Sequence, residues 1–301
     1  MSFSSDTKAE LCKAFPGNKC CAVAECYGIL LYCNTFSNNQ VKIVTESRDF
    51  AQQLPKLFKR AFGFGFDGFP DDFDRAGKLI FTIEDSEKIA KLFAAYGYER
   101  DKTLAHHINL GVLEESCCRA SFMRGAFLAG GSITAPEKQY HLEMVTDHYN
   151  VSRETYALAL EMGFSPKSVS RGGNYITYFK NSTEIEDFLT TIGAPVSAME
   201  IMSAKIMKDM TNSINRLVNC DTANATKIVD AAGEQVEAIK KLERQGKLAS
   251  LPEKLRATAE LRLKYPELSL AQLAAISVPV VTKSCLNHRL RKLIEIAKEL
   301  H

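Results

Sequence analysis

Alternation of apolar and polar residues along the first two hundred positions predicts short β-strands separated by amphipathic helices. The segments QVKIVTES, KLIFTIED, YHLEMVTD and NYITYFKN alternate with a period of two, as strands with one buried face do. Apolar residues three and four positions apart predict helices over 47–64 and 150–164, each ending at a Gly-Phe pair. These patterns predict an α+β domain.

The order of these elements occurs twice. CCAVAECYGILLYCNTF, from Cys20, is matched by CCRASFMRGAFLAGGSI, from Cys117, 97 positions later. Each copy is predicted to run αββαββα, and two copies that pack about a pseudo-twofold axis bury the sheet face that one copy exposes. We therefore expect a duplicated domain over 1–197, with repeat one at about 1–98, repeat two at about 117–197 and a connection between them.

Small residues recur at helical spacing in the first segment of each copy. A glycine in a helix interior costs about 1 kcal/mol relative to alanine, so its presence there indicates that two backbones approach closely. We expect a tight seam between these two helices, formed by Gly125, Ala126, Ala129 and Gly130 on one side and by Ala22, Ala24 and Gly28 on the other.

From residue 198 onward the pattern predicts helices only. A linker helix is expected over 198–222. Its apolar residues recur at helical spacing, which favours burial of one face: Ile201, Ile206, Met210, Ile214 and Leu217. Asp221 or Thr222 is expected to cap the next helix. An all-α domain is expected over 223–301. Its last two helices, capped by Ser269 and Thr282, form a short helix, a tight turn and a longer basic helix, which is a helix-turn-helix.

The last helix has two distinct faces. Leu286, Leu290, Leu293 and Ala297 recur at core spacing, whereas Lys283, Asn287 and Arg291 share an outer stripe beside Ser284 and His288. The N-terminal part of such a helix enters the DNA major groove, where Asn pairs with adenine and Arg or Lys with guanine. Arg289 and Lys292, toward the flanks, suit phosphate contacts.

Charge is unevenly distributed between the two regions. The net charge is +2, but residues 199–301 carry 17 Lys and Arg against 12 Asp and Glu. Over 282–298 five basic residues stand against one acid, Glu295. Such an excess suits a polyanionic partner, although a solvated helix face explains charge alone equally well.

Nine cysteines, an odd number without disulfide-framework spacing, favour reduced core thiols. Four of them form two Cys-Cys doublets, but adjacent cysteines chelate one metal poorly and no C-x-x-C accompanies them. No metal and no cofactor are therefore expected. Neither a membrane span nor a secretory signal is found, which favours the cytoplasm.

The chain resembles a known family in three stretches: FMRGAFLAGGS, SINRLVNCDTAN and TKSCLNHRLRKL. The repeat resembles the LAGLIDADG homing-endonuclease fold, and the whole chain resembles the WhiA family of bacterial regulators, which join a degenerate LAGLIDADG-like domain to a C-terminal helix-turn-helix. The order of the last helices resembles sigma factor region 4.

The resemblance implies a sequence-specific regulator of transcription, linked to cell division, chromosome segregation or sporulation. Its implied partners are double-stranded DNA and another transcription regulator or RNA polymerase, at the nucleoid. It also suggests phosphate contacts by Arg216, Asn224 and Lys227, for which capping and turn chemistry is an equal alternative.

Nuclease activity is not expected. Enzymes of the LAGLIDADG fold hold divalent metal ions with one carboxylate at the foot of each motif helix. Here those positions carry Gly130 and Cys33, and no acid lies between Glu25 and Glu46. A metal-dependent endonuclease with unrecognised acids and a scaffold that binds protein or RNA remain the alternatives.

Overall fold

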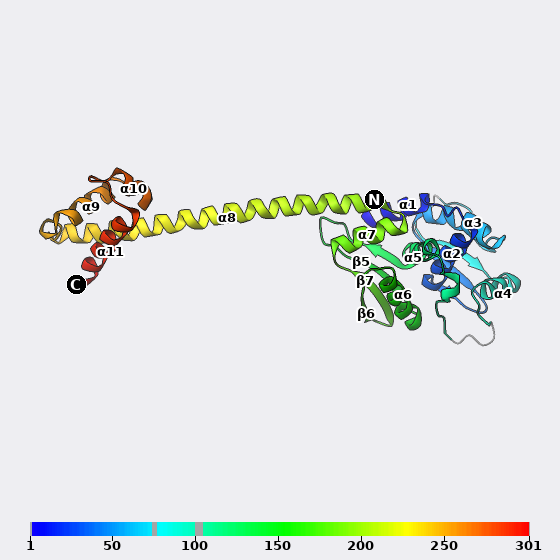
Figure 1. Ribbon diagram of the computed structural model, residues 1–301. Helices are drawn as coiled ribbons and strands as arrows, with labels where there is room; N and C mark the ends of the chain where they lie inside the picture. The colour runs from blue at the N-terminus through cyan, green and yellow to red at the C-terminus, as the bar shows by residue number, and fades with distance from the viewer. Residues whose placement is uncertain (1, 74–76, 100–104, 301) are drawn as a thin grey trace. The chain divides into compact units, whose positions relative to one another are not determined.

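The computed structural model describes residues 2–73, 77–99 and 105–300, and the chain divides into two compact units, Met1–Lys208 and Asp209–His301 (Figure 1). Helix α8 (Pro195–Arg244) contributes residues to both units. Within the described residues, no helix combines the length and the apolar composition that a membrane span requires.

The N-terminal unit is an α+β domain with two antiparallel sheets. The first repeat comprises α1 (Phe3–Lys13), α2 (Lys19–Tyr32), β1 (Thr35–Phe36), β2 (Val41–Thr45), α3 (Arg48–Phe62), β3 (Leu79–Ile83) and α4 (Ser86–Ala95). After the 3-10 turn η1 (Leu110–Val112), the second repeat comprises α5 (Ser116–Gly130), β4 (Gly131–Ile133), β5 (Leu142–Thr146), α6 (Tyr149–Glu161), β6 (Lys167–Arg171), β7 (Asn174–Phe179) and α7 (Ser182–Ile192). The four strands predicted from alternation correspond to β2, β3, β5 and β7.

The two repeats differ by one strand. The second follows the predicted αββαββα order, and its sheet has the strand order β4-β5-β7-β6. The first has the order β1-β2-β3, so the prediction of four strands is wrong for the described part of this repeat. Where β6 pairs with β7 in the second sheet, the segment before β3 makes a single bridge, Gly68 to Thr82.

The predicted seam between α2 and α5 is confirmed. A Cβ added to Gly28 would lie 2.1 Å from Phe122 O, and a Cβ on Gly125 would lie 2.0 Å from Glu25 O. Ala22, Ala24 and Ala126 are fully buried along the same contact. The backbones of the two motif helices therefore touch, and side chains larger than hydrogen at the two glycines would separate them.

A buried ion pair crosses this seam. Arg124 Nη2 and Nε donate to Glu25 Oε2 at 2.6 and 3.0 Å, and the Glu25 side chain is fully buried. Burial raises the pKa of the Glu25 carboxyl, and the Arg124 charge opposes this effect. Arg124 Nη1 also donates to Ile192 O at 3.2 Å, so one guanidinium joins α2, α5 and the end of α7.

Helix α8 corrects the prediction for the linker. The expected break at 219–222 is wrong, because the helix continues without interruption from Pro195 to Arg244. The expected core stripe is also wrong beyond Ile201, which is buried; Ile206, Met210, Ile214 and Leu217 are 55–63% exposed. Asp and Thr favour helix starts, but that preference is weak when nothing stops the preceding helix.

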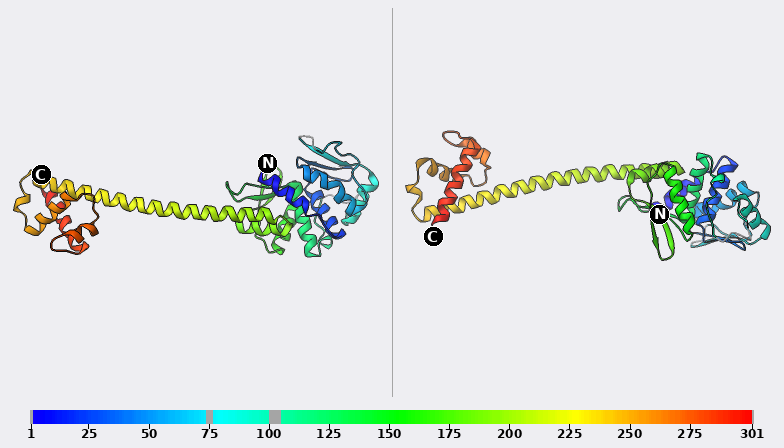
Figure 2. Two further views of the ribbon diagram at one scale, coloured as in Figure 1. Left: turned by 90° about the horizontal axis from the view of Figure 1, so that it is seen from above. Right: turned by 60° about the horizontal axis from the view of Figure 1, so that its bottom comes forward.

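The C-terminal unit is helical. It contains the end of α8, the 3-10 turn η2 (Leu248–Ser250), α9 (Glu253–Lys264), α10 (Leu270–Ile276) and α11 (Lys283–Glu299) (Figure 2). Its core is formed by ten apolar side chains: Ile239, Leu242, Leu255, Ala259, Leu273, Ala274, Leu286, Leu290, Leu293 and Ala297. All four helices contribute to this core, which holds α11 in a fixed rotation.

The seam generates a stability prediction. Gly125→Ala should lower the free energy of unfolding of the N-terminal unit by at least about 3 kcal/mol, because the new methyl meets a backbone carbonyl that cannot move aside. Urea denaturation followed by tyrosine fluorescence measures the change. Gly17→Ala is the matched control, because no atom lies within 4 Å of its added Cβ. Equal stability of the two variants would contradict the close contact.

Candidate nucleic-acid interface

The helix-turn-helix is built by two capped helices. Ser269 and Gln272 form a capping box at the start of α10, and the Thr282 hydroxyl accepts from Cys285 N at 3.2 Å at the start of α11. Both predicted caps are confirmed. Such caps satisfy backbone donors that would otherwise be unpaired, so they fix where each helix begins.

The turn between α10 and α11 is organised by Ser277. Its hydroxyl donates to Ala274 O at 2.8 Å and accepts from Val281 N at 3.2 Å. The peptide bond between Val278 and Pro279 is cis. The two hydrogen bonds of Ser277 set the direction in which α11 leaves the turn.

A buried arginine holds the preceding loop. Arg262 is 2% exposed, and its Nη1 donates to Leu268 O at 2.7 Å, so the guanidinium fixes the connection between α9 and α10. The sequence analysis missed this residue, because a single Arg in an amphipathic helix gives no signal of burial.

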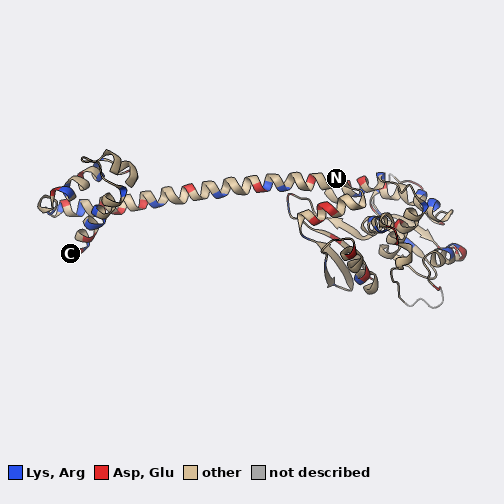
Figure 3. Ribbon diagram, viewed as in Figure 1, with Lys and Arg blue, Asp and Glu red and all other residues tan. Residues whose placement is uncertain are grey.

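Helix α11 presents the two faces that its sequence predicts. Leu286, Leu290, Leu293 and Ala297 are at most 3% exposed, which confirms the core stripe. The candidate DNA-contacting residues lie elsewhere on the helix: Lys283, Ser284, His288, Arg291 and Lys292 are exposed, and Asn287 and Arg289 are half-buried. Lys and Arg are marked in blue on this helix in Figure 3.

The basic side chains on this face are not paired with acids in the described part of the chain. Among the described residues, none of Lys283, Arg289, Arg291 and Lys292 forms an ion pair within 4 Å. The first turn of α11 carries no acid. Arg289 differs from the others, because it lines a hollow with Leu261 and Lys264 of α9. The arrangement therefore presents cations and the Asn287 amide to a partner molecule, and the cations have no ion-pair partner among the described residues.

Arg216, Asn224 and Lys227 all lie on α8 and are exposed. Because α8 is continuous at these three positions, they neither cap a helix nor form a turn, and that alternative for their role is excluded. Asn224 Nδ2 donates to Cys220 Sγ at 3.7 Å, a contact within the same helix. Their predicted role as phosphate contacts stays a prediction.

The feet of the motif helices lack metal ligands. A Cβ on Gly130 would lie 2.5 Å from Val145 O and 2.9 Å from Tyr32 Cδ1, which leaves no room for a carboxylate there. Cys33 Sγ hydrogen-bonds to Leu30 O and Thr35 O at 3.2 Å each, and burial raises the pKa of this thiol to about 12. A neutral thiol and a bare α-carbon do not supply the oxygen ligands that Mg²⁺ requires.

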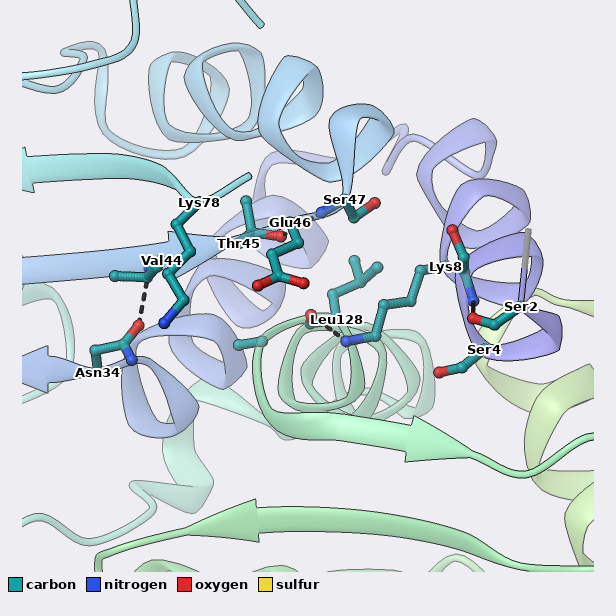
Figure 4. A pocket seen from close by; sticks show the side chains of 12 residues that line it. Ser2, Ser4, Lys8, Asn34, Val44, Thr45, Glu46, Ser47, Lys78 and Leu128 are labelled. Atoms are coloured by element: carbon teal, nitrogen blue, oxygen red, sulfur yellow. Dashed lines mark hydrogen bonds between the residues drawn. The ribbon is translucent and has the colours of Figure 1, made fainter. Parts of the chain in front are cut away.

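A polar cavity of about 620 Å³ lies beside these feet (Figure 4). Figure 4 shows Lys8 and Lys78 reaching in from opposite sides, with Glu46 between them. The other lining residues are Ser2, Ser4, Ser5, Asn34, Val44, Thr45, Ser47, Leu128 and Ala129. The cavity gathers residues from α1, the strand β2 and the end of α5, so local sequence patterns gave no signal for it.

Lys8 is the most constrained cation of the cavity. Its Nζ donates to Leu128 O at 3.1 Å and lies 5.9 Å from the centre of the Phe127 ring. Burial lowers the pKa of Lys8 to about 8. With two lysines, hydroxyl groups and a single acid, the cavity suits an anion better than a divalent metal ion.

Comparisons with known proteins agree with both units. The model for the WhiA C-terminal HTH domain matches residues 214–297, and the model for the WhiA LAGLIDADG-like domain matches residues 119–211. A "Probable cell division protein WhiA" of Clostridium botulinum (strain Hall) is 40% identical over 100% of this chain and 99% of its own length. The chain belongs to the WhiA family.

Further relatives carry the same name. The "Probable cell division protein WhiA" of Clostridium perfringens is 38% identical over 100% of this chain and 98% of its own length. The crystal structure of full-length DUF199/WhiA from Thermatoga maritima has a TM-score of 0.60 and 24% identity, covering 100% of this chain and 99% of that one. The crystal structure of the N-terminal LAGLIDADG domain of DUF199/WhiA has a TM-score of 0.51 and 21% identity, over 64% of this chain and 92% of that one. The predicted family and fold class, a LAGLIDADG-like α+β domain followed by a helical HTH domain, are confirmed.

Proposed function

We propose that this WhiA-family chain is a sequence-specific DNA-binding regulator of transcription that does not cleave DNA. The observation that carries the proposal is the open face of α11, which combines exposed cations and a half-buried amide with a fully buried leucine stripe. A helix used only for packing needs the leucine stripe but has no need of an acid-free polar face.

The proposed binding mode has α11 in the major groove. Asn287 and Arg291 then face base edges, since an amide matches adenine and a guanidinium matches guanine N7 and O6. Lys283, Ser284 and His288 border them, and Arg289 and Lys292 contact phosphates at the flanks. Ser277 and Arg262 position the helix through the turn and the loop before it.

A second set of DNA contacts is proposed on α8. Arg216 precedes Ile239, the buried core residue of the same helix, by 23 positions, which corresponds to about 35 Å at 1.5 Å per residue. Arg216 therefore lies far along the helix from the core that positions α11, and Asn224 and Lys227 lie between them, 15 and 12 positions before Ile239. Phosphate contact outside the recognition site is the role that their position favours.

The biological process is proposed from the relatives, which are named probable cell division proteins. We propose that the target promoters control cell division, and chromosome segregation or sporulation where the host performs them. Capture of genomic DNA with the purified chain, followed by sequencing, would test this. Recovery of random fragments without a shared site would contradict sequence-specific regulation.

Base contact by α11 is tested by substitution. Asn287→Ala and Arg291→Ala should each weaken binding to the captured site by about 1–3 kcal/mol and leave binding to random duplex almost unchanged. Fluorescence anisotropy with both duplexes measures the difference. Glu299→Gln, at the exposed end of the same helix, is the matched control and should bind as the parent does. Equal losses on both duplexes would assign the two residues to the phosphate backbone.

Phosphate contact by α8 predicts a different signature. Arg216→Ala combined with Lys227→Ala should weaken binding to specific and random duplex alike. It should also reduce the slope of log affinity against log salt by about 0.9 for each phosphate that the variant no longer neutralises, because fewer counterions are released. Lys240→Ala, which removes a cation paired with Glu237 on the same helix, is the control. An unchanged slope in the double variant would exclude these phosphate contacts.

The absence of cleavage is directly measurable. Supercoiled plasmid incubated with the chain in Mg²⁺ or Mn²⁺ should remain intact, because the motif helices offer no carboxylate pair. Nicking that is stopped by a chelator and by Glu46→Gln, the single acid lining the cavity, would establish a nuclease instead. A scaffold for protein or RNA would show neither nicking nor salt-dependent duplex binding.

A further inference from the structure

Two pairs of adjacent cysteines meet at one end of the helix seam. Cys20 and Cys21 lie in the first turn of α2, and Cys117 and Cys118 lie in the first turn of α5. The doublets occupy equivalent positions of the two repeats, 97 residues apart. Because α2 and α5 are in backbone contact, symmetry-related positions near their starts come together.

The thiol groups are close enough to share one ligand. The Sγ atoms of Cys20, Cys21 and Cys118 all lie within 4.8 Å of one another, and Cys117 interacts with both Cys21 and Cys118. Zinc bound by four thiolates has Zn–S distances of about 2.3 Å, which places the sulfur atoms about 3.8 Å apart in a tetrahedron. No pair among Cys20, Cys21 and Cys118 exceeds this spacing by more than about 1 Å, and the contacts of Cys117 place a fourth sulfur beside them.

The surroundings favour negative sulfur when a dication is present. A bound dication stabilises thiolates directly, so metal binding and deprotonation of the cysteines are coupled. Neither α2 nor α5 has a side-chain cap hydrogen bond, so the positive ends of both helix dipoles lie beside the sulfurs, and Lys19 adds a positive charge next to Cys20.

We propose that Cys20, Cys21, Cys117 and Cys118 bind one Zn²⁺ ion, which joins the two repeats at the start of the seam. Soft thiolate ligands select zinc over Mg²⁺ or Ca²⁺, and the cluster contains no carboxylate among the described residues. The ion closes a loop of about 97 residues and stabilises the folded N-terminal unit by mass action. Adjacent cysteines within one doublet chelate a single ion poorly, and the second doublet reaches the first only through tertiary contact.

Metal binding by the full-length chain tests the proposal. The reduced protein, stripped with a chelator and given Zn²⁺, should retain one zinc per chain by elemental mass spectrometry. Co²⁺ in its place should give thiolate-to-cobalt charge-transfer absorption and the visible bands of a tetrahedral site. Zinc should also raise the melting temperature of the N-terminal unit.

Variants separate this site from the other cysteines. Cys20→Ser, an exposed position, and Cys20→Ser combined with Cys118→Ser should weaken zinc binding. The double variant should lose more than about 100-fold in zinc affinity. A loss of about 100-fold is the most expected when the substituted residue only hydrogen-bonds to a metal ligand. The double variant should also lose the zinc-dependent rise in melting temperature. Cys220→Ser combined with Cys285→Ser removes two cysteines of the C-terminal unit and should bind zinc as the parent does.

Three results would overturn the proposal. One is a chain that retains no zinc after gel filtration. Another is Cys20→Ser protein with native circular dichroism and unchanged zinc affinity. The third is a disulfide between the doublets that mass spectrometry finds in freshly purified protein, with no zinc binding after its reduction. Because the readout is metal binding, the outcome is independent of whether α11 binds DNA.

Discussion

The backbone contact between α2 and α5 is the constraint on which the N-terminal unit depends. Hydrogen is the only substituent that fits at Gly28 and Gly125, where a Cβ would lie 2.0–2.1 Å from a carbonyl oxygen of the opposite helix. Such proximity excludes water and leaves little tolerance for polar groups. The one ion pair inside the seam, Glu25 with Arg124, persists because each charge is satisfied by the other. Both repeats are thereby held in a single relative arrangement.

This contact has different consequences at the two ends of the helices. At their starts it gathers four thiols. At their ends it places Gly130 and Cys33, which supply no carboxylate to a metal ion. Gly130 is packed so closely that a side chain there would meet Val145 O, which leaves no room for an acid at this position. The neighbouring cavity is lined by Lys8 and Lys78 with one acid, Glu46, so it suits an anion better than a cation.

The sequence was informative where a pattern is local. Period-two alternation located β2, β3, β5 and β7, and cap residues located the starts of α10 and α11. It failed at 219–222, because Asp221 and Thr222 have the side chains of a helix start while the preceding helix has no residue that stops it. The thiol cluster and the cavity stayed unpredicted, since each requires segments that are distant in sequence to be brought together. The burial of Arg262 was missed because a single Arg in an amphipathic helix gives no signal of it.

The buried and exposed faces of α11 are not independent. Leu286, Leu290 and Leu293 are buried against α8, α9 and α10, so the rotation of the helix about its own axis is fixed by packing. That rotation in turn decides whether Asn287 and Arg291 can approach base edges, because neighbouring positions on a helix differ by about 100°. Hydrogen bonds to bases tolerate little angular error. Specific reading by this face therefore depends on a well-packed core behind it, whereas phosphate contacts through long, flexible lysines would tolerate a looser one.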